Sequence, residues 1–236
     1  MILPDLLPAV FIERPNRFLV RCNVDNKIID AHLPDPGRLK ELLLPGAEIF
    51  IEHTPNPSRK TQYTVHLIKN RNVFVSINTS LPNKLVYISL KNNCLPGFEM
   101  YTLTRSEVPV NRHRFDFELR SPEGKKVLME VKSVTLVEDD GTARFPDAVT
   151  SRGKSHAETL AILDKKGIET WILFIVQRKD AICFTPHWER DPAFAKALLT
   201  ASVSGVNIKV VSCEITQKSM IIGNTLPFYL EDYRDD

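Results

Sequence analysis

An aspartate, a glutamate and a lysine form the most informative group in this sequence. Asp116 precedes the turn-forming segment Ser121–Gly124, and Glu130, Val131 and Lys132 follow it. Side chains alternate between the two faces of a strand, so we expect Glu130 and Lys132 on one side while Val131 enters the core. If the segments on either side of the turn pair as a hairpin, Asp116 can stand beside Glu130. The sequence therefore predicts two carboxylates and a lysine gathered at one place.

Such a group has the chemistry of a metal site. Asp116, Glu130 and the backbone carbonyl of Val131 are oxygen ligands of the kind that Mg²⁺ or Mn²⁺ prefers. A metal there would polarise a phosphate and help to form hydroxide. Lys132 would orient the attacking water or offset charge that develops on the phosphate. We therefore predict Asp116, Glu130 and Lys132 as catalytic residues of a metal-dependent nucleic-acid phosphodiesterase, in the D-x(n)-E-x-K pattern of the PD-(D/E)XK nuclease superfamily.

Other interpretations of these residues remain open. A glutamate and a lysine two positions apart on a strand are more often a solvated face with a weak ion pair. Glu118 lies on the same predicted face as Asp116 and could be the ligand instead. Asp116 is favoured because the basic run 112–114 closely precedes it. Glu107 and Asp147 are further acids that could join the metal site.

A second group of polar residues leads into a predicted helix. Backbone N–H groups at a helix N-terminus bind anions, and Arg152 and Lys154 would add positive charge there. His156, one turn inside, could contact a phosphate or assist proton transfer. An ordinary helix cap on a basic face is the alternative. The residues predicted to bind nucleic acid are Arg38, Arg59, Lys60, Arg112, Arg114, Arg152, Lys154 and His156.

The first part of the chain has the pattern of a small barrel. Short segments of alternating polarity run from Phe18 to about residue 78, separated by turn-forming sequence. Five strands at this spacing predict an OB-type barrel, although an SH3-like barrel fits almost as well. Phe50 and Tyr63, beside basic residues, could stack on bases, but aromatics on a strand are more often core. We predict a barrel over residues 1–82.

The pattern changes to α/β over residues 83–236. Residues Lys154–Lys166 predict a helix closed by Gly167, and Thr170–Val176 predicts a buried strand. Asp191 before a proline predicts the start of another helix, which leads into a strand at Ile208–Val211. The predicted fold is therefore an OB-like barrel followed by a PD-(D/E)XK nuclease-like α/β domain with a mixed sheet.

Composition limits the location and the partners. The chain of 236 residues carries 43% hydrophobic and 25% charged residues and a formal charge of +2. The longest apolar stretch, Trp171–Val176, is too short to span a bilayer, and the N-terminal segment lacks the apolar region of a signal peptide. We expect a cytoplasmic protein without membrane contact. We expect a nucleic acid as the partner, with DNA favoured over RNA, held by local positive clusters, and we leave a homodimer open.

Ten segments of the sequence are similar to those of the sugar fermentation stimulation protein A (SfsA) family. They are Arg17-Phe18, HLPDPGRL at 32–39, Pro45-Gly46, Arg59-Lys60, VSINTSLPN at 75–83, RFDF at 114–117, MEVKSVTL at 129–136, FPDAVTSRGKSH at 145–156, LFIVQRKD at 173–180 and DPAFAKALLTASVSGV at 191–206. The segment at 32–39 resembles the archaeal form. His113, Ser151 and Ser155 depart from the residues expected in the family.

The resemblance implies an OB-type barrel joined to a PD-(D/E)XK domain, with DNA binding and a link to the expression of sugar-utilisation genes. It places the metal-site acids at Asp116 and Glu130 and the lysine at Lys132. A non-catalytic DNA-binding regulator is the rival interpretation; the intact acids and lysine argue against it. A barrel that binds oligosaccharide or protein is a third.

Overall fold

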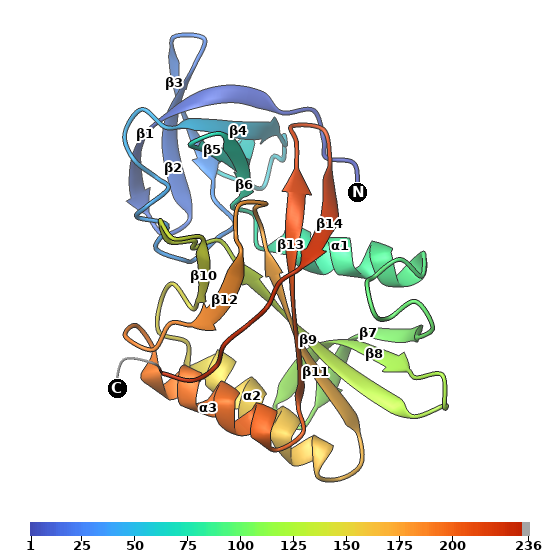
Figure 1. The fold of residues 1–236 in the computed structure, drawn as a ribbon. Coiled ribbons are helices and arrows are strands. Elements are labelled where there is room, and N and C mark those ends of the chain that lie inside the picture. The colour runs from blue at the N-terminus through green and yellow to red at the C-terminus, as the bar shows by residue number, and fades with distance from the viewer. Residues whose placement is uncertain (233–236) are drawn as a thin grey trace.

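A computed structural model of the chain describes residues 1–232, in which a β-barrel precedes a layered α/β domain (Figure 1). The strands of this first sheet are β1 (Leu7–Asn16), β2 (Leu19–Val24), β3 (Lys27–His32), β4 (Glu48–His53), β5 (Tyr63–Asn70) and β6 (Val73–Ser76). They are ordered β3-β2-β1-β4-β5-β6, and a pairing between His32 and Thr64 joins β3 to β5 and closes the barrel. The predicted barrel is confirmed.

The first strand of the barrel escapes prediction from the sequence pattern. β1 contains Pro8 and Pro15, which cannot donate to a strand ladder, and only Ala9 and Phe11 of its residues are buried. The closed ring of the barrel consists of the five strands β1 to β5, as expected, and β6 extends the same sheet by pairing with β5. Phe50 is 1% exposed and belongs to the core, so it does not offer a stacking surface for a base.

The α/β domain is built on a six-stranded mixed sheet. Its elements are α1 (Ser80–Lys91), β7 (Thr102–Val110), β8 (His113–Arg120), β9 (Lys126–Val134), α2 (Ser151–Asp164), β11 (Glu169–Val176), α3 (Pro192–Val203), β13 (Asn207–Ile215) and β14 (Met220–Thr225). The order is β14-β13-β11-β9-β8-β7, with β11 parallel to both β9 and β13. A separate parallel pair, β10 (Thr142–Phe145) and β12 (Cys183–Pro186), lies nearer the barrel (Figure 1).

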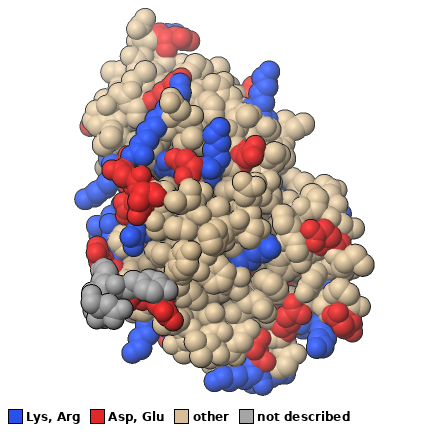
Figure 2. Space-filling model, in the orientation of Figure 1, with Lys and Arg blue, Asp and Glu red and all other residues tan. Residues whose placement is uncertain are grey.

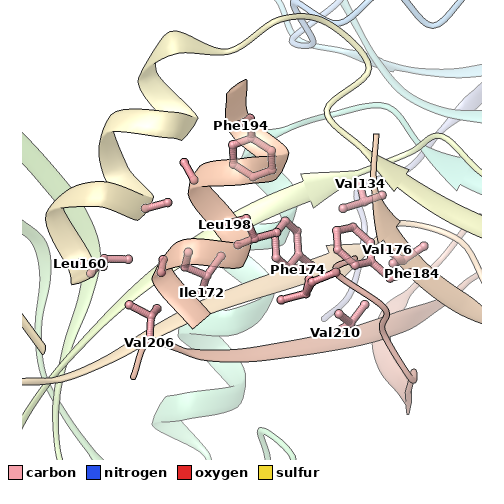
Figure 3. Close-up of a cluster of buried hydrophobic side chains, with 14 of the residues drawn as sticks. Val134, Leu160, Ile172, Phe174, Val176, Phe184, Phe194, Leu198, Val206 and Val210 are labelled. Carbon is pink, nitrogen blue, oxygen red and sulfur yellow. The ribbon is translucent and has the colours of Figure 1, made fainter. Parts of the chain in front are cut away.

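Helices cover both faces of this sheet. Leu81 and Leu85 of α1 pack on one face with Phe117 and Met129. The helices α2 and α3 pack on the other face, where Phe174 of the sheet meets the cluster drawn in Figure 3. α3 begins as predicted, because Asp191 accepts a hydrogen bond from the Phe194 backbone N–H. α2 begins at Ser151, earlier than predicted.

The hairpin that carries the predicted acids has an irregular end. Backbone pairing of β8 with β9 runs from Arg120↔Lys126 to Phe117↔Met129. Two residues beyond Met129, the Val131 N–H donates to the side chain of Asp116. The carboxylate of Asp116 therefore replaces a backbone partner where the two strands diverge.

Several contacts fix the barrel on the α/β domain. The Ser76 N–H donates to the Gln177 carbonyl at 3.1 Å, and Arg178 Nη2 donates to Asn70 Oδ1 at 3.1 Å. Arg178 is nearly fully buried, so this contact belongs to the interior of the junction. On the face shown in Figure 2, basic and acidic side chains are interspersed. Within residues 1–232, no helix is long and apolar enough to cross a membrane.

Candidate active site

A cleft of ≈ 1010 Å³ separates the barrel from the α/β domain, and its lining includes Asp116, Glu130 and Lys132. The barrel contributes the β1–β2 turn and the loop 35–38 to the lining. The α/β domain contributes the loop 145–150, which leads into α2. The structure thus brings the three predicted catalytic residues together beside surfaces from both domains.

Asp116 is held from two sides. Its Oδ2 accepts the Val131 N–H at 2.7 Å, and its Oδ1 accepts Asn83 Nδ2 at 2.6 Å. Asn83 lies on α1, so the helix on one face of the sheet helps to orient the carboxylate. The sequence alone does not identify Asn83 as a site residue, because its contact depends on how α1 packs against the strands.

Glu130 is held by Lys132 and His156. Its Oε1 accepts Lys132 Nζ at 2.7 Å and lies 2.5 Å from His156 Nδ1. Arg152 Nε can only donate, and it lies 3.4 Å from His156 Nε2. His156 Nε2 must therefore accept, and Nδ1 carries the proton that is donated to Glu130. His156 is buried and acts as a support for Glu130 in this arrangement.

The two carboxylates have opposite protonation tendencies. Burial and the neighbouring charge of Glu130 raise the pKa of Asp116 to about 7. Burial also acts to raise the pKa of Glu130, but Lys132 and His156 outweigh it and hold that pKa below its usual range. The pair therefore carries less than two full negative charges near neutral pH unless a cation joins it.

One oxygen of the pair fits a cation. Glu130 Oε2 is buried and has no hydrogen-bond partner within residues 1–232. A buried carboxylate oxygen without a partner is costly, and a hard divalent cation would satisfy it. Asp116 Oδ1 and Oδ2 each accept one hydrogen bond and retain further lone pairs. The described residues contain no cluster of three or more His, Cys, Asp or Glu side chains at metal-binding geometry, so water, carbonyl or phosphate oxygens would complete the shell.

The other acids considered as ligands occupy different positions. Glu118 pairs with Lys126 at 2.7 Å, and Glu107 pairs with Arg114 at 2.5 Å. Neither lines the cleft. Asp147 does line it, and its Oδ2 accepts the Arg38 N–H at 2.8 Å. Asp147 therefore connects the cleft walls of the two domains.

The predicted nucleic-acid-binding residues separate into distinct groups. Arg38 and Arg152 line the cleft. Arg112 and Arg114 line a neighbouring hollow, which also includes Arg152 and His156. Lys154 pairs with Glu158 along α2 at 3.7 Å. Arg59 and Lys60 line neither the cleft nor the hollow.

Further basic residues of the barrel also line the cleft. Arg17 and Lys40 line it beside Arg38. Arg14 Nη1 and Nη2 donate to the carbonyls of residues 17, 35, 37 and 38. The spacing of Arg38 and Lys40 was visible in the sequence, whereas the role of Arg14 depends on the folded loop.

Comparisons with known proteins find related proteins that match this chain over almost its whole length. A family model described as the SfsA N-terminal OB domain matches residues 12–77, and one described as the Sugar fermentation stimulation protein RE domain matches residues 80–219. A sugar fermentation stimulation protein homolog from Desulforamulus reducens is 39% identical over 230 residues, which cover 98% of this chain and 95% of the relative. A homolog from Clostridium tetani is 39% identical over 209 residues, covering 89% and 90%.

A solved structure is also similar. The structure of Pyrococcus furiosus SfsA in complex with Ca²⁺ has a TM-score of 0.88 and 27% identity, and the match covers 97% of this chain and 98% of that one. The OB-type barrel and the mixed-sheet α/β domain are thereby confirmed. The archaeal source, the homodimer and the cytoplasmic location stay predictions. The chain belongs to the sugar fermentation stimulation protein (SfsA) family.

Proposed function

We propose that the protein is a metal-dependent nuclease that hydrolyses phosphodiester bonds of nucleic acid, most favourably DNA, in the cleft between its two domains. The observation that carries the proposal is the placement of Asp116 and Glu130 beside each other in a cleft, with one buried Glu130 oxygen lacking a partner. Lys132 stands at the same carboxylate. The cleft has room for a strand and presents basic side chains from both domains.

Asp116 and Glu130 would hold Mg²⁺ or Mn²⁺, with the Val131 carbonyl as a further ligand. When bound, such an ion supplies Lewis-acid stabilisation of the phosphate and lowers the pKa of a nearby water. The Ca²⁺ named with the solved relative supports a divalent cation in this family. Hard oxygen donors suit all three ions.

The side chains around the carboxylates would stabilise charge, hold the two carboxylates in place and bind phosphate. Lys132 Nζ would place positive charge beside the reacting phosphate and orient the water through its remaining N–H groups. Asn83 and His156 hold Asp116 and Glu130 in one geometry, so little reorganisation is required when substrate binds. Arg38 and Arg152 would contact phosphates of the strand on two sides of the cleft.

Hydrolysis of end-labelled single- and double-stranded DNA and RNA, with Mg²⁺, Mn²⁺ or EDTA, tests this proposal. We expect cleavage that requires metal and falls at least about a hundredfold in Asp116→Asn and in Lys132→Ala. Glu118→Gln and Lys126→Ala are matched controls, because this pair lies on the same hairpin outside the cleft. Both controls should cleave like the wild type.

The test also distinguishes the rival function. Cleavage that survives both Asp116→Asn and Lys132→Ala would locate activity elsewhere or in a contaminant. Binding of DNA without cleavage of any substrate would support a DNA-binding regulator in place of an enzyme. A substrate preference in the wild type would identify DNA or RNA and the strand form.

A further inference from the structure

A second hollow of ≈ 530 Å³ lies at the start of α2, against the β7–β8 turn. The turn contributes Arg112, the start of β8 contributes His113 and Arg114, and α2 contributes Arg152, Ser155 and His156. We call this the basic hollow. Arg152 belongs to both its lining and that of the cleft, so the two spaces meet at this side chain.

The charges of the basic hollow are of one sign. Its lining contains no acidic side chain among the residues described. Glu107 pairs with Arg114 Nε at 2.5 Å from outside the lining, and both side chains are more than half exposed. Arg112 has no ion pair among residues 1–232. The concentration of positive charge is also felt by His113, whose pKa is lowered by burial and then by the charges of its basic neighbours.

Hydrogen-bond donors converge on the same space. The first two turns of α2 border this region and contribute Arg152 and Ser155 to its lining. A helix N-terminus adds partial positive charge to the full charges of the arginines. Ser155 Oγ lies 3.3 Å from His113 Nε2, and this contact joins α2 to the start of β8. Planar guanidinium groups and hydroxyls are the donors that bind phosphate oxygens.

The hollow is physically connected to the carboxylates. Arg152 contacts His156, and His156 contacts Glu130. A group bound in the hollow would therefore lie next to the strand position at the carboxylates, and Arg152 could contact both.

We propose that the basic hollow binds a second phosphate of the nucleic-acid strand, next to the phosphate that lies at Asp116 and Glu130. The inference rests on the proposed function for the position of the first phosphate. The second phosphate has two possible sources: a monoester at a strand end, which would make the enzyme end-directed, or an internal diester, which would set the register of a continuous strand.

Binding of short thymidine fragments tests the proposal without requiring hydrolysis. The fragments are TpT, with one diester; pTpT and TpTp, with an added terminal phosphate; and TpTpT, with a second diester. Each competes with a fluorescent thymidine oligonucleotide for the full chain in EDTA. We expect at least one extended fragment to bind about tenfold more tightly than TpT, from the added charged hydrogen bonds.

Arg112→Gln should remove this gain and leave binding of TpT unchanged. Arg105→Gln is the matched control, because Arg105 is an exposed arginine on β7 outside the hollow. A gain only with pTpT or TpTp identifies a terminal phosphate; a gain with TpTpT identifies an internal one. Equal binding of all fragments, or a gain that survives Arg112→Gln, would overturn the proposal. If the extended fragments bind more tightly but no substrate is cleaved, the second phosphate site stands and only the proposed hydrolysis is overturned.

Discussion

Glu130 uses its two oxygens differently. Oε1 is held by Lys132 and His156, whereas Oε2 is buried without a partner within the described chain. One oxygen therefore fixes the orientation of the carboxylate while the other is available to a cation. A ligand oriented before the metal arrives loses less conformational freedom on binding, which favours affinity.

The pKa of Asp116 makes metal binding depend on pH. Its value of about 7 lies above the ordinary aspartate value of 3.8, so the metal-free folded protein retains a proton there below pH 7. A cation must displace this proton. We expect the affinity for Mn²⁺ to rise up to about tenfold per pH unit between about pH 5 and 7 and to level off above that range. Calorimetry in buffers of different ionisation enthalpy measures both affinity and released protons.

The same shift affects the metal-free protein with the opposite sign. The folded state binds more protons at Asp116 than the unfolded state between about pH 4 and 7, so this contribution to stability falls as the pH rises through that window.

Glu118→Gln serves as the control for the Mn²⁺ titration, and this variant should show the same pH dependence of Mn²⁺ affinity as the wild type. An affinity for Mn²⁺ that stays constant from pH 5.5 to 7 would contradict the assignment of Asp116 as a ligand that loses a proton when the metal binds.

The positions of Glu130, Val131 and Lys132 follow from strand alternation, which is a local property of the chain. The positions of the residues that hold the two carboxylates do not follow from any local property. Asn83 reaches Asp116 from α1, and His156 reaches Glu130 from α2. Nothing in the local sequence around either residue specifies these contacts. A lone histidine near a helix start is compatible with phosphate binding, capping or support of an acid, and only the packing of α2 on the sheet distinguishes them.

At the scale of elements, the loop 35–38 is tightly constrained in the cleft wall. Arg14 donates to its carbonyls, and the Gly37 N–H donates to Asp35 Oδ1 at 2.7 Å. A Cβ at residue 37 would collide with Asp147 Oδ2 and lie 2.8 Å from Asp35 Oδ1. Glycine at this position therefore allows the two domains to approach each other.

Gly37→Ala should destabilise the protein by about 1–3 kcal/mol, because the added methyl group overpacks the contact with Asp147. Chemical denaturation measures the change in the free energy of unfolding. A double-mutant cycle with Asp147→Ala provides the control, and the cost of the alanine at residue 37 should be smaller in that background. An equal cost in both backgrounds would show that Asp147 is not the obstacle.

The predictability of the elements depended on how strongly each was patterned. The strand β11 is a continuous apolar run, and α3 carries both an aspartate cap and a proline, so both could be predicted. The strand β7 lies at the sheet edge and is mostly exposed, which leaves little hydrophobic signal. β1 contains prolines that the local rules assign to strand edges or breaks.

At the scale of the whole molecule, charge is local rather than global. A formal charge of +2 gives weak long-range attraction for a polyanion, and the face in Figure 2 mixes both signs. The cleft and the basic hollow must then supply the electrostatic part of binding. The cleft lies between the two domains and the basic hollow lies at the start of α2. Together these positions imply a defined path for the nucleic-acid strand.

Salt dependence measures this local contribution. We expect the logarithm of the DNA association constant to fall linearly with the logarithm of salt concentration, with a slope of about −0.7 per neutralised phosphate on a single strand. Arg38→Gln and Arg112→Gln should each reduce the magnitude of the slope by up to about 1. Arg105→Gln, outside both spaces, should preserve it. Unchanged slopes in both test variants would exclude these arginines from phosphate contact.

The hydrogen bond from the Val131 amide to Asp116 makes this amide proton a natural spectroscopic label. Its resonance senses the charge of the carboxylate directly, whereas the neighbouring amides of β9 sense strand carbonyls. Protonation or cation capture at Asp116 would change the chemical shift and the hydrogen-exchange rate of this one amide first. The occupancy of the site can therefore be followed in the unmodified protein, without substrate and without turnover.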